Sequence, residues 1–388
     1  MGFMGLVGLV TSCTSEEVEV PKESRSVPVE LKSYSAWYQE NVGTRAWTPP
    51  TGFSVFEENN DQSIGVNFTQ DTKDPIFGYF FKSAGKWRFK VISPTDISEE
   101  DAIKAEDYYL YGYTPHTTGI SCTVTDKADG KAKFSEGAKL TIQNLPSVTA
   151  HDVCVLVGAK NGSSTDNDGG LQLGNFKYHA ELMGDKAEAD KHNYVFLLFD
   201  HLYAALSIEM RVHSSYNALR TIKLKKLSLK TSADGVETNE YTDIEITLTN
   251  RTDGLTPIDK DAEDNDKITF TQKGDPISDG EIFSSTKGET LGTDITTHQG
   301  HFMPLGITTL ELTSTYDVYD KNVTPQHPDG NLIRQNCTAT NKLVLKDLFS
   351  GQSATGRGQR YIVEMTIHPT YLYMLSEPDL DNPTVKVE

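Results

Sequence analysis

Short runs of alternating apolar and polar residues recur along most of the chain, and this period of two predicts β-strands. The strictest run spans residues 222–229, and one slip within it, at Lys225-Lys226, predicts a β-bulge. The other runs that predict strands cover residues 53–56, 64–68, 76–81, 86–91, 108–116, 138–145, 152–158, 241–248, 267–271, 306–319, 341–345 and 359–367.

Helix signals are scarce by comparison. Residues 194–212 begin as an apolar run and then alternate, which predicts two strands that meet near Asp200-His201. The best helix pattern covers residues 98–105, with Ser98 as its cap, but it is short and lies between predicted strands. We therefore predict an all-β protein that is built from two β-sandwiches with long loops.

The chain of 388 residues is long enough for two domains of ordinary size. Its composition changes between residues 159 and 192, where a Gly-, Ser- and Asp-rich loop and a charged stretch interrupt the strand pattern. We predict an N-terminal sandwich over residues 46–190 and a C-terminal sandwich over residues 191–388.

The balance of charge limits the partners that the chain can have. Its formal net charge is −19 and its isoelectric point is near 4.9. Because like charges repel, this argues against nucleic acid or an anionic membrane surface as the partner. The charge suits an exposed surface protein.

The first 45 residues have features of segments that are processed or removed. An apolar run over residues 3–10 leads to Cys13, which follows small residues as in a bacterial lipobox. No Lys or Arg precedes the run, so we interpret residues 1–12 as the remnant of a lipoprotein signal whose true start lies upstream. Residues 13–45 would then form a polar tether and a removable strand, with Cys13 as the lipidated residue.

Both ends of the chain contain alternating segments that could exchange between subunits. Near the N-terminus the apolar positions are Val27, Val29 and Leu31, and Pro28 favours an edge strand. Arg45-Ala46 offers a trypsin-like cleavage site beyond them, with Arg25 as a rival site. At the other end, residues 380–388 form a candidate donor strand, and its apolar positions are Leu380, Val385 and Val387. Either segment could equally be an ordinary edge strand of its own sheet.

Candidate catalytic chemistry is sparse. The chain has no His-x-x-x-His pair, no Gly-x-Ser-x-Gly elbow and no Gly-rich phosphate loop. His201 beside Asp200 could act as a base, but a structural or surface histidine is the favoured interpretation. The acidic loop over residues 259–266 is interpreted as solvated rather than as a calcium site, and Cys122 and Cys154 as buried free thiols. We expect no enzyme activity, no cofactor and no bound metal.

Several segments, taken in order, resemble one family. These are residues 10–13, 43–46, 110–115, 199–206 and the ending at residues 371–385. Together they are similar to the fimbrillins, the type V pilins and pilin-like surface lipoproteins of host-associated anaerobic bacteria.

The resemblance implies two tandem transthyretin-like Greek-key sandwiches and a lipid anchor in the outer membrane. It implies cleavage at Arg45 by a trypsin-like surface protease, which removes the first strand so that another fimbrial subunit can donate one. The expected function is a structural or accessory subunit of an adhesive surface fimbria. The alternative is a surface lipoprotein or fimbrial tip adhesin that binds a glycan or a host protein.

Overall fold

The computed structural model is composed almost entirely of β-strands, which confirms the predicted all-β fold class. It describes residues 27–28, 30–36, 63–83, 86–95, 102–117, 119–126, 133–162, 174–180, 194–250, 267–348, 353–369 and 378–387. The only helices named within these ranges are single turns, α2 (Ser214–Asn217) and α3 (Leu345–Leu348). In this portion of the chain no helix is long and apolar enough to cross a membrane.

The largest sheet, sheet A, runs in the order β1-β5-β4-β3-β6-β9-β11-β2, and β10 pairs with β6. Most of its neighbouring strands are antiparallel, so short turns connect β3, β4 and β5. Its strands are β1 (Val27–Pro28), β2 (Glu30–Ala36), β3 (Ser63–Gln70), β4 (Lys73–Ser83), β5 (Lys86–Ser93), β6 (Asp107–His116), β9 (Cys154–Gly162), β10 (Lys177–His179) and β11 (Tyr194–His201).

Sheet B packs against one face of sheet A and has the order β16-β15-β8-β7. It combines strands from distant parts of the chain, because β15 pairs antiparallel with β8 about a hundred residues earlier, as in Ile246↔Leu140. Its strands are β7 (Ser121–Asp126), β8 (Gly137–Pro146), β15 (Asn239–Thr249) and β16 (Ile268–Pro276).

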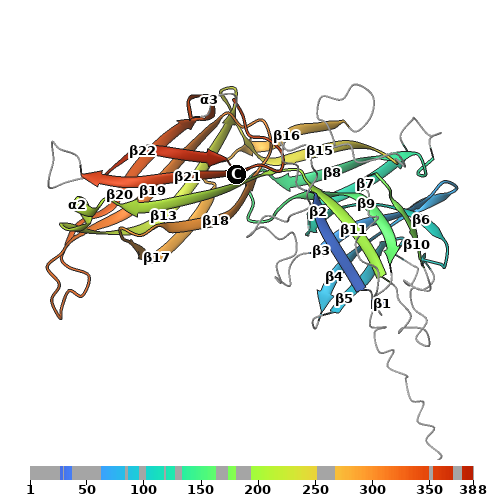
Figure 1. The fold of residues 1–388 in the computed structure, drawn as a ribbon, viewed down its shortest axis with the longest axis horizontal. Helices are drawn as coiled ribbons and strands as arrows, with labels where there is room; N and C mark the ends of the chain where they lie inside the picture. Colours follow the sequence, from blue (N-terminus) through green and yellow to red (C-terminus); the bar gives the residue numbers. More distant parts are fainter. Residues whose placement is uncertain are drawn as a thin grey trace, which may run out of the picture.

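Sheets C and D form the second pair, which lies beside the first in Figure 1. Sheet C has the order β18-β12-β21-β22, and in sheet D the central pair β13–β19 is flanked by β14, β17 and β20. Their strands are β12 (Ala204–Val212), β13 (Arg220–Ala233), β14 (Val236–Glu237), β17 (Glu281–Leu291), β18 (Thr296–Met303), β19 (Thr309–Asp320), β20 (Leu332–Val344), β21 (Arg360–Pro369) and β22 (Pro378–Val387).

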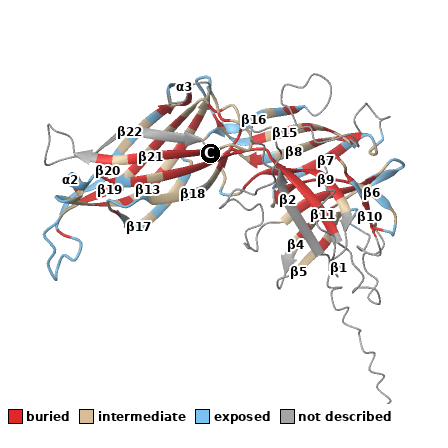
Figure 2. Ribbon diagram, in the orientation of Figure 1, coloured by how far each residue is buried: buried red, intermediate tan, exposed pale blue. Residues whose placement is uncertain are grey.

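Three apolar clusters hold these layers together, and Figure 2 shows the buried residues concentrated on the central strands. One cluster lies between sheets A and B, and another lies between sheets C and D. The third, the interior cluster, lies on the other face of sheet A. Sheet A is therefore buried on both faces at β6, β9 and β11, which explains their near-continuous apolar sequences. The interior cluster consists of Ile64, Val66, Phe68, Phe80, Phe89, Ile103, Tyr108, Leu110, Cys154, Leu156, Ala159, Tyr178, Ala180, Val195, Leu197 and Phe199.

Two detailed sequence predictions are confirmed. The register of β13 shifts between Leu224 and Lys226 against both β17 and β19, so the bulge lies where the alternation slips. Strand β11 ends at His201 and β12 begins at Ala204, as the pattern around Asp200-His201 predicts. The predicted strand over residues 53–56 and residues 98–101 of the helix predicted over residues 98–105 lie outside the described residues, and residues 103–105 are not helical.

The proposed division of the chain near residue 190 stays a prediction. Strand β11, which follows that point, pairs with β9 in sheet A. Strand β15 likewise joins sheet B, whose strand β8 precedes residue 190. Hydrogen bonding therefore connects the two sides of the predicted boundary.

Candidate strand-exchange site

The N-terminal strands lie at both edges of sheet A. Strand β1 pairs antiparallel with β5, with Val27 opposite Phe89. Strand β2 pairs parallel with β11, from Glu30 opposite Tyr194 to Ala36 opposite Asp200 (Figure 1). Only one residue separates β1 from β2, so a single short segment reaches both edges. Sheet A therefore curls until β5 and β11 approach each other, and β1 and β2, here called the closing segment, lie between them.

The closing segment covers backbone groups that no other described strand pairs. On β5 and β11 the opposite sides are occupied by β4 and β9, respectively. Without β1 and β2, both edges would present unpaired N–H and C=O groups. A strand from another chain could satisfy the same groups, which is the geometry of β-strand addition.

The apolar interior behind these edges is densely aromatic. The Phe89 ring centroid lies 5.0 Å from that of Phe68 and 4.9 Å from that of Phe80. On β11, Val195, Leu197 and Phe199 are fully buried in the same cluster. The strand that closes sheet A thus lies beside a large apolar core.

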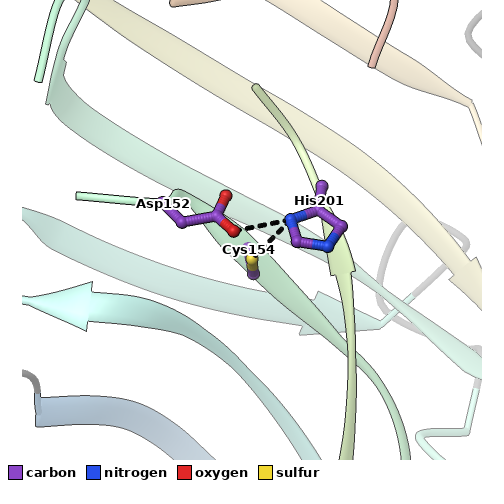
Figure 3. A group of neighbouring side chains, drawn as sticks. All are labelled: Asp152, Cys154 and His201. Atoms are coloured by element: carbon purple, nitrogen blue, oxygen red, sulfur yellow. Dashed lines mark hydrogen bonds and ion pairs between the residues drawn. The ribbon is translucent and has the colours of Figure 1, made fainter. Parts of the chain in front are cut away.

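A buried polar cluster lies at the end of β11, where β2 also ends. Strand pairing places His201 opposite Cys154, and directly opposed residues share a face of a sheet. Figure 3 shows the side chains of Asp152, Cys154 and His201 directed toward one another. His201 Nδ1 lies 2.7 Å from Asp152 Oδ2 and 3.5 Å from Cys154 Sγ. These three residues are called the polar cluster below.

A second charged pair joins this region to the sheet C–D pair. Arg357 Nη1 lies 2.5 Å from Asp200 Oδ2 and donates a 3.0 Å hydrogen bond to the His201 carbonyl. Arg357 precedes β21, and the neighbouring Gly358 N–H donates to the Tyr203 carbonyl. The end of β11 is therefore fixed to the connection that leads into β21.

The polar cluster does not have the geometry of a nucleophilic triad. In such a triad the two ring nitrogens of histidine contact different partners, the acid and the nucleophile. Here the same nitrogen, Nδ1, approaches both Asp152 and Cys154. Burial, together with the Asp152 and Asp200 carboxylates, raises the pKa of the Cys154 thiol well above its usual range, so the reactive thiolate is disfavoured.

Some of the predicted site residues lie in described strands, and others lie outside the described residues. Cys13, Val29, Arg45 and Ala46 lie outside the described residues, so lipidation and cleavage stay predictions. Val27 lies in β1 and Leu31 in β2, whereas the candidate donor residues Leu380, Val385 and Val387 lie in β22, which pairs antiparallel with β21.

The histidine and cysteines are placed as the favoured interpretation expects. His201 is 1% exposed, and Cys122 and Cys154 are buried free thiols. The acidic loop over residues 259–266 lies outside the described residues.

Sequence reasoning missed the polar cluster, although it considered two of its members separately. Asp152 and Cys154 lie two positions apart where the chain enters β9, and this spacing places them on one face. His201, however, is 47 residues beyond Cys154 in the sequence. The only signal was the rare placement of polar residues at the ends of two apolar strands.

Comparison with known proteins gives structural neighbours only. No family model and no curated protein matches the chain. A solved candidate cell adhesion protein from Bacteroides uniformis is 11% identical, covers 94% of this chain and 97% of its own, and has a TM-score of 0.38. Another candidate cell adhesion protein, from Bacteroides ovatus, is 13% identical. The match covers 94% of this chain and 98% of the neighbour's chain, with a TM-score of 0.32.

The tip fimbrial protein Mfa3 from Porphyromonas gingivalis is a further neighbour. It is 11% identical, with 85% of this chain and 94% of that chain covered and a TM-score of 0.24. These neighbours are adhesion and fimbrial proteins at low identity, and TM-scores below 0.5 do not establish a shared fold for the whole chain.

Proposed function

We propose that the protein is a subunit of a bacterial surface fimbria that assembles by strand exchange after its N-terminal segment is cleaved. The observation that carries the proposal is the position of β1 and β2 between β5 and β11. The closing segment precedes Arg45 in the chain, so a cut after Arg45 would separate it from the rest of sheet A. The fimbrillin-like segments of the sequence support the same role.

In this mechanism the closing segment occupies the acceptor site until cleavage. Its release would expose the β11 edge and the interior cluster at the same time. An incoming strand would gain main-chain hydrogen bonds along the edge and bury its alternate side chains. Lipid attachment at Cys13 would hold the uncut protein at the outer membrane, and contact with other subunits would follow cleavage by a trypsin-like protease.

The test uses a disulfide that locks the closing segment in place. Glu30 and Tyr194 are paired residues at the start of the β2–β11 ladder, so Glu30→Cys with Tyr194→Cys is the chosen pair. The trypsin-treated, reduced double variant should form SDS-resistant ladders, whereas the oxidised form should remain monomeric. The single Glu30→Cys variant is the control for new thiol chemistry.

Cleavage-site variants complete this test. Arg45→Ala should abolish the ladders, whereas Arg25→Ala should leave them unchanged, because a cut at residue 25 leaves the closing segment attached. Wild-type protein that is fully cut at Arg45 and still monomeric would contradict the proposal, as would ladders from the oxidised double variant.

A tip position within the fimbria is the second candidate, and the pairing of β22 favours it. Strand β22 pairs with β21 from Tyr361↔Val387 to Pro369↔Pro378, so it lies within its own sheet C. A subunit at the tip accepts a strand and donates none. Deleting residues 380–388 should then leave assembly onto other subunits intact, whereas a stalk subunit should lose it.

A further inference from the structure

We propose that Asp152, Cys154 and His201 form a buried binding site for one zinc ion at the end of β11. One thiol, one imidazole and one carboxylate converge there, and their ligand atoms all lie within 4.8 Å of one another. Zinc accepts this mixture of sulfur, nitrogen and oxygen ligands, whereas calcium and magnesium prefer oxygen alone.

The distances are close to those around a tetrahedral ion. With usual zinc–ligand bond lengths, nitrogen and sulfur ligands lie about 3.6 Å apart, and nitrogen and oxygen ligands lie about 3.4 Å apart. The observed Nδ1–Sγ distance is 3.5 Å and the Nδ1–Oδ2 distance is 2.7 Å. A rotation of the Asp152 side chain that moves its oxygen by less than about 1 Å would therefore admit the ion.

Asp152 provides independent support for a ligand. Its side chain is only 8% exposed, and whereas Oδ2 faces His201 Nδ1 at 2.7 Å, Oδ1 is buried without a hydrogen-bond partner. Buried carboxylates are ordinarily paired and hydrogen-bonded, so this one has unused ligand capacity. Its second oxygen could complete the coordination of the ion.

Charge is also balanced when zinc is bound. Asp200 and Arg357 neutralise each other beside the cluster. Zinc binding would displace the Cys154 thiol proton to water, and His201 would stay a neutral imidazole with its proton on Nε2, so that Nδ1 can bind the ion. The doubly positive ion would then face one thiolate and one carboxylate, which leaves the buried site neutral.

The location gives the ion a structural role. It would join the residues that begin β9 to the end of β11, the strand whose free edge pairs with β2. The ion would therefore hold the acceptor edge in position whether or not the closing segment is present.

The experiment titrates the chelator-treated full-length protein with Co²⁺, a coloured probe for zinc sites, and then adds Zn²⁺. One equivalent of cobalt should produce a thiolate-to-cobalt charge-transfer absorption, which one equivalent of zinc then removes. Cys154→Ser should abolish this absorption. Cys122→Ser is the matched control, since Cys122 is another buried thiol but lies on β7, outside the polar cluster. Cys13→Ser and Cys337→Ser should likewise retain the absorption.

Asp152→Asn keeps the size of the side chain and provides a second readout. It should lower zinc affinity by more than about 100-fold, the upper end of the loss caused by residues that only support a ligand. Zinc should raise the thermal midpoint of the wild-type protein but not that of this variant. Absence of the cobalt absorption in wild-type protein, or its persistence in Cys154→Ser, would overturn the proposal.

Discussion

The sheet A–B pair and the sheet C–D pair hold the two ends of the chain differently. Sheet A takes up the N-terminal strands at two edges, because β1 contacts β5 and β2 contacts β11. Sheet C takes up β22 at a single edge, against β21. Removal of β1 and β2 together would leave two unpaired edges, those of β5 and β11, whereas removal of β22 would leave one, that of β21.

This difference bears on the strand exchange proposed above. Removal of the closing segment would expose strand edges and the interior cluster together, so the cut protein would have a strong tendency to bind a replacement. Removal of β22 would expose a single edge, that of β21. For the proposed strand exchange, the N-terminal segment is therefore the favoured control element.

The largest effect is expected from truncation. A chain that begins at Ala46 should lose on the order of 5 kcal/mol of unfolding free energy, because about one net kcal/mol is lost for each missing hydrogen bond. A chain that ends at Glu377 should lose a similar amount, because β22 pairs with β21 at eight positions and β1 and β2 together pair at nine, two with β5 and seven with β11. Urea unfolding of the two truncated chains measures both values. A loss of less than about 1 kcal/mol at either end would contradict the pairing of that terminal segment.

Phe89→Ala tests the interior cluster behind the closing segment. It should cost about 3–5 kcal/mol and also speed proteolysis near Val27, the residue opposite Phe89. Phe176→Ala removes an equally buried ring from the cluster between sheets A and B, so it is the matched control. The control should cost about as much stability without changing N-terminal proteolysis. Equal rates of N-terminal proteolysis in both variants would contradict the claim that the interior cluster stabilises the closing segment.

Gly112→Ala tests how tightly β6 packs against β3 within sheet A. A methyl group at Gly112 would lie 2.2 Å from the Gly65 carbonyl oxygen, so backbone must move, at a cost of about 1–3 kcal/mol. Gly292→Ala, next to β17 in the second sheet pair, has its nearest added contact at 3.9 Å and should change stability by less than about 0.5 kcal/mol. Denaturation midpoints of the two variants give the comparison, and a neutral Gly112→Ala would contradict the close approach of β3 and β6.

The smallest effect concerns pH and the second sheet pair. Burial lowers the pKa of His298, although Glu289 opposes the shift, and burial together with His298 lowers the pKa of His301. The folded state therefore favours the neutral rings, and this contribution to stability is complete above the ordinary pKa near 6.5 and decreases as pH falls below it. The thermal midpoint should fall less between pH 7.5 and pH 5 in His298→Asn with His301→Gln than in wild-type protein. An identical fall in both proteins would show that these rings do not contribute.

Local patterns in the sequence predicted many of the strands but missed β7, β17 and β18. Alternation identified β13 with its bulge, and the polar interruption at Asp200-His201 identified the junction of β11 and β12. These features depend on the face that each side chain presents, which is a property of neighbouring residues.

The pairing of strands that are distant in the sequence could not be predicted from such local patterns. Nothing local in residues 30–36 specifies a parallel partner at residues 194–200, and nothing in β15 specifies β8. The polar cluster has the same origin, because its members become neighbours only when β9 and β11 pair. Register and partner choice arise from the packing of whole sheets, which a single sequence does not display.

Residue-resolved amide hydrogen exchange on β11 tests the central claim most directly. The measurement compares the intact protein with protein that has been cut at Arg45 and separated from its N-terminal fragment. In the cut protein, the β11 amides that face β2 should lose protection, and those that face β9 should keep it. Unchanged protection along residues 194–200 after removal of the fragment would contradict the claim that the N-terminal segment closes sheet A.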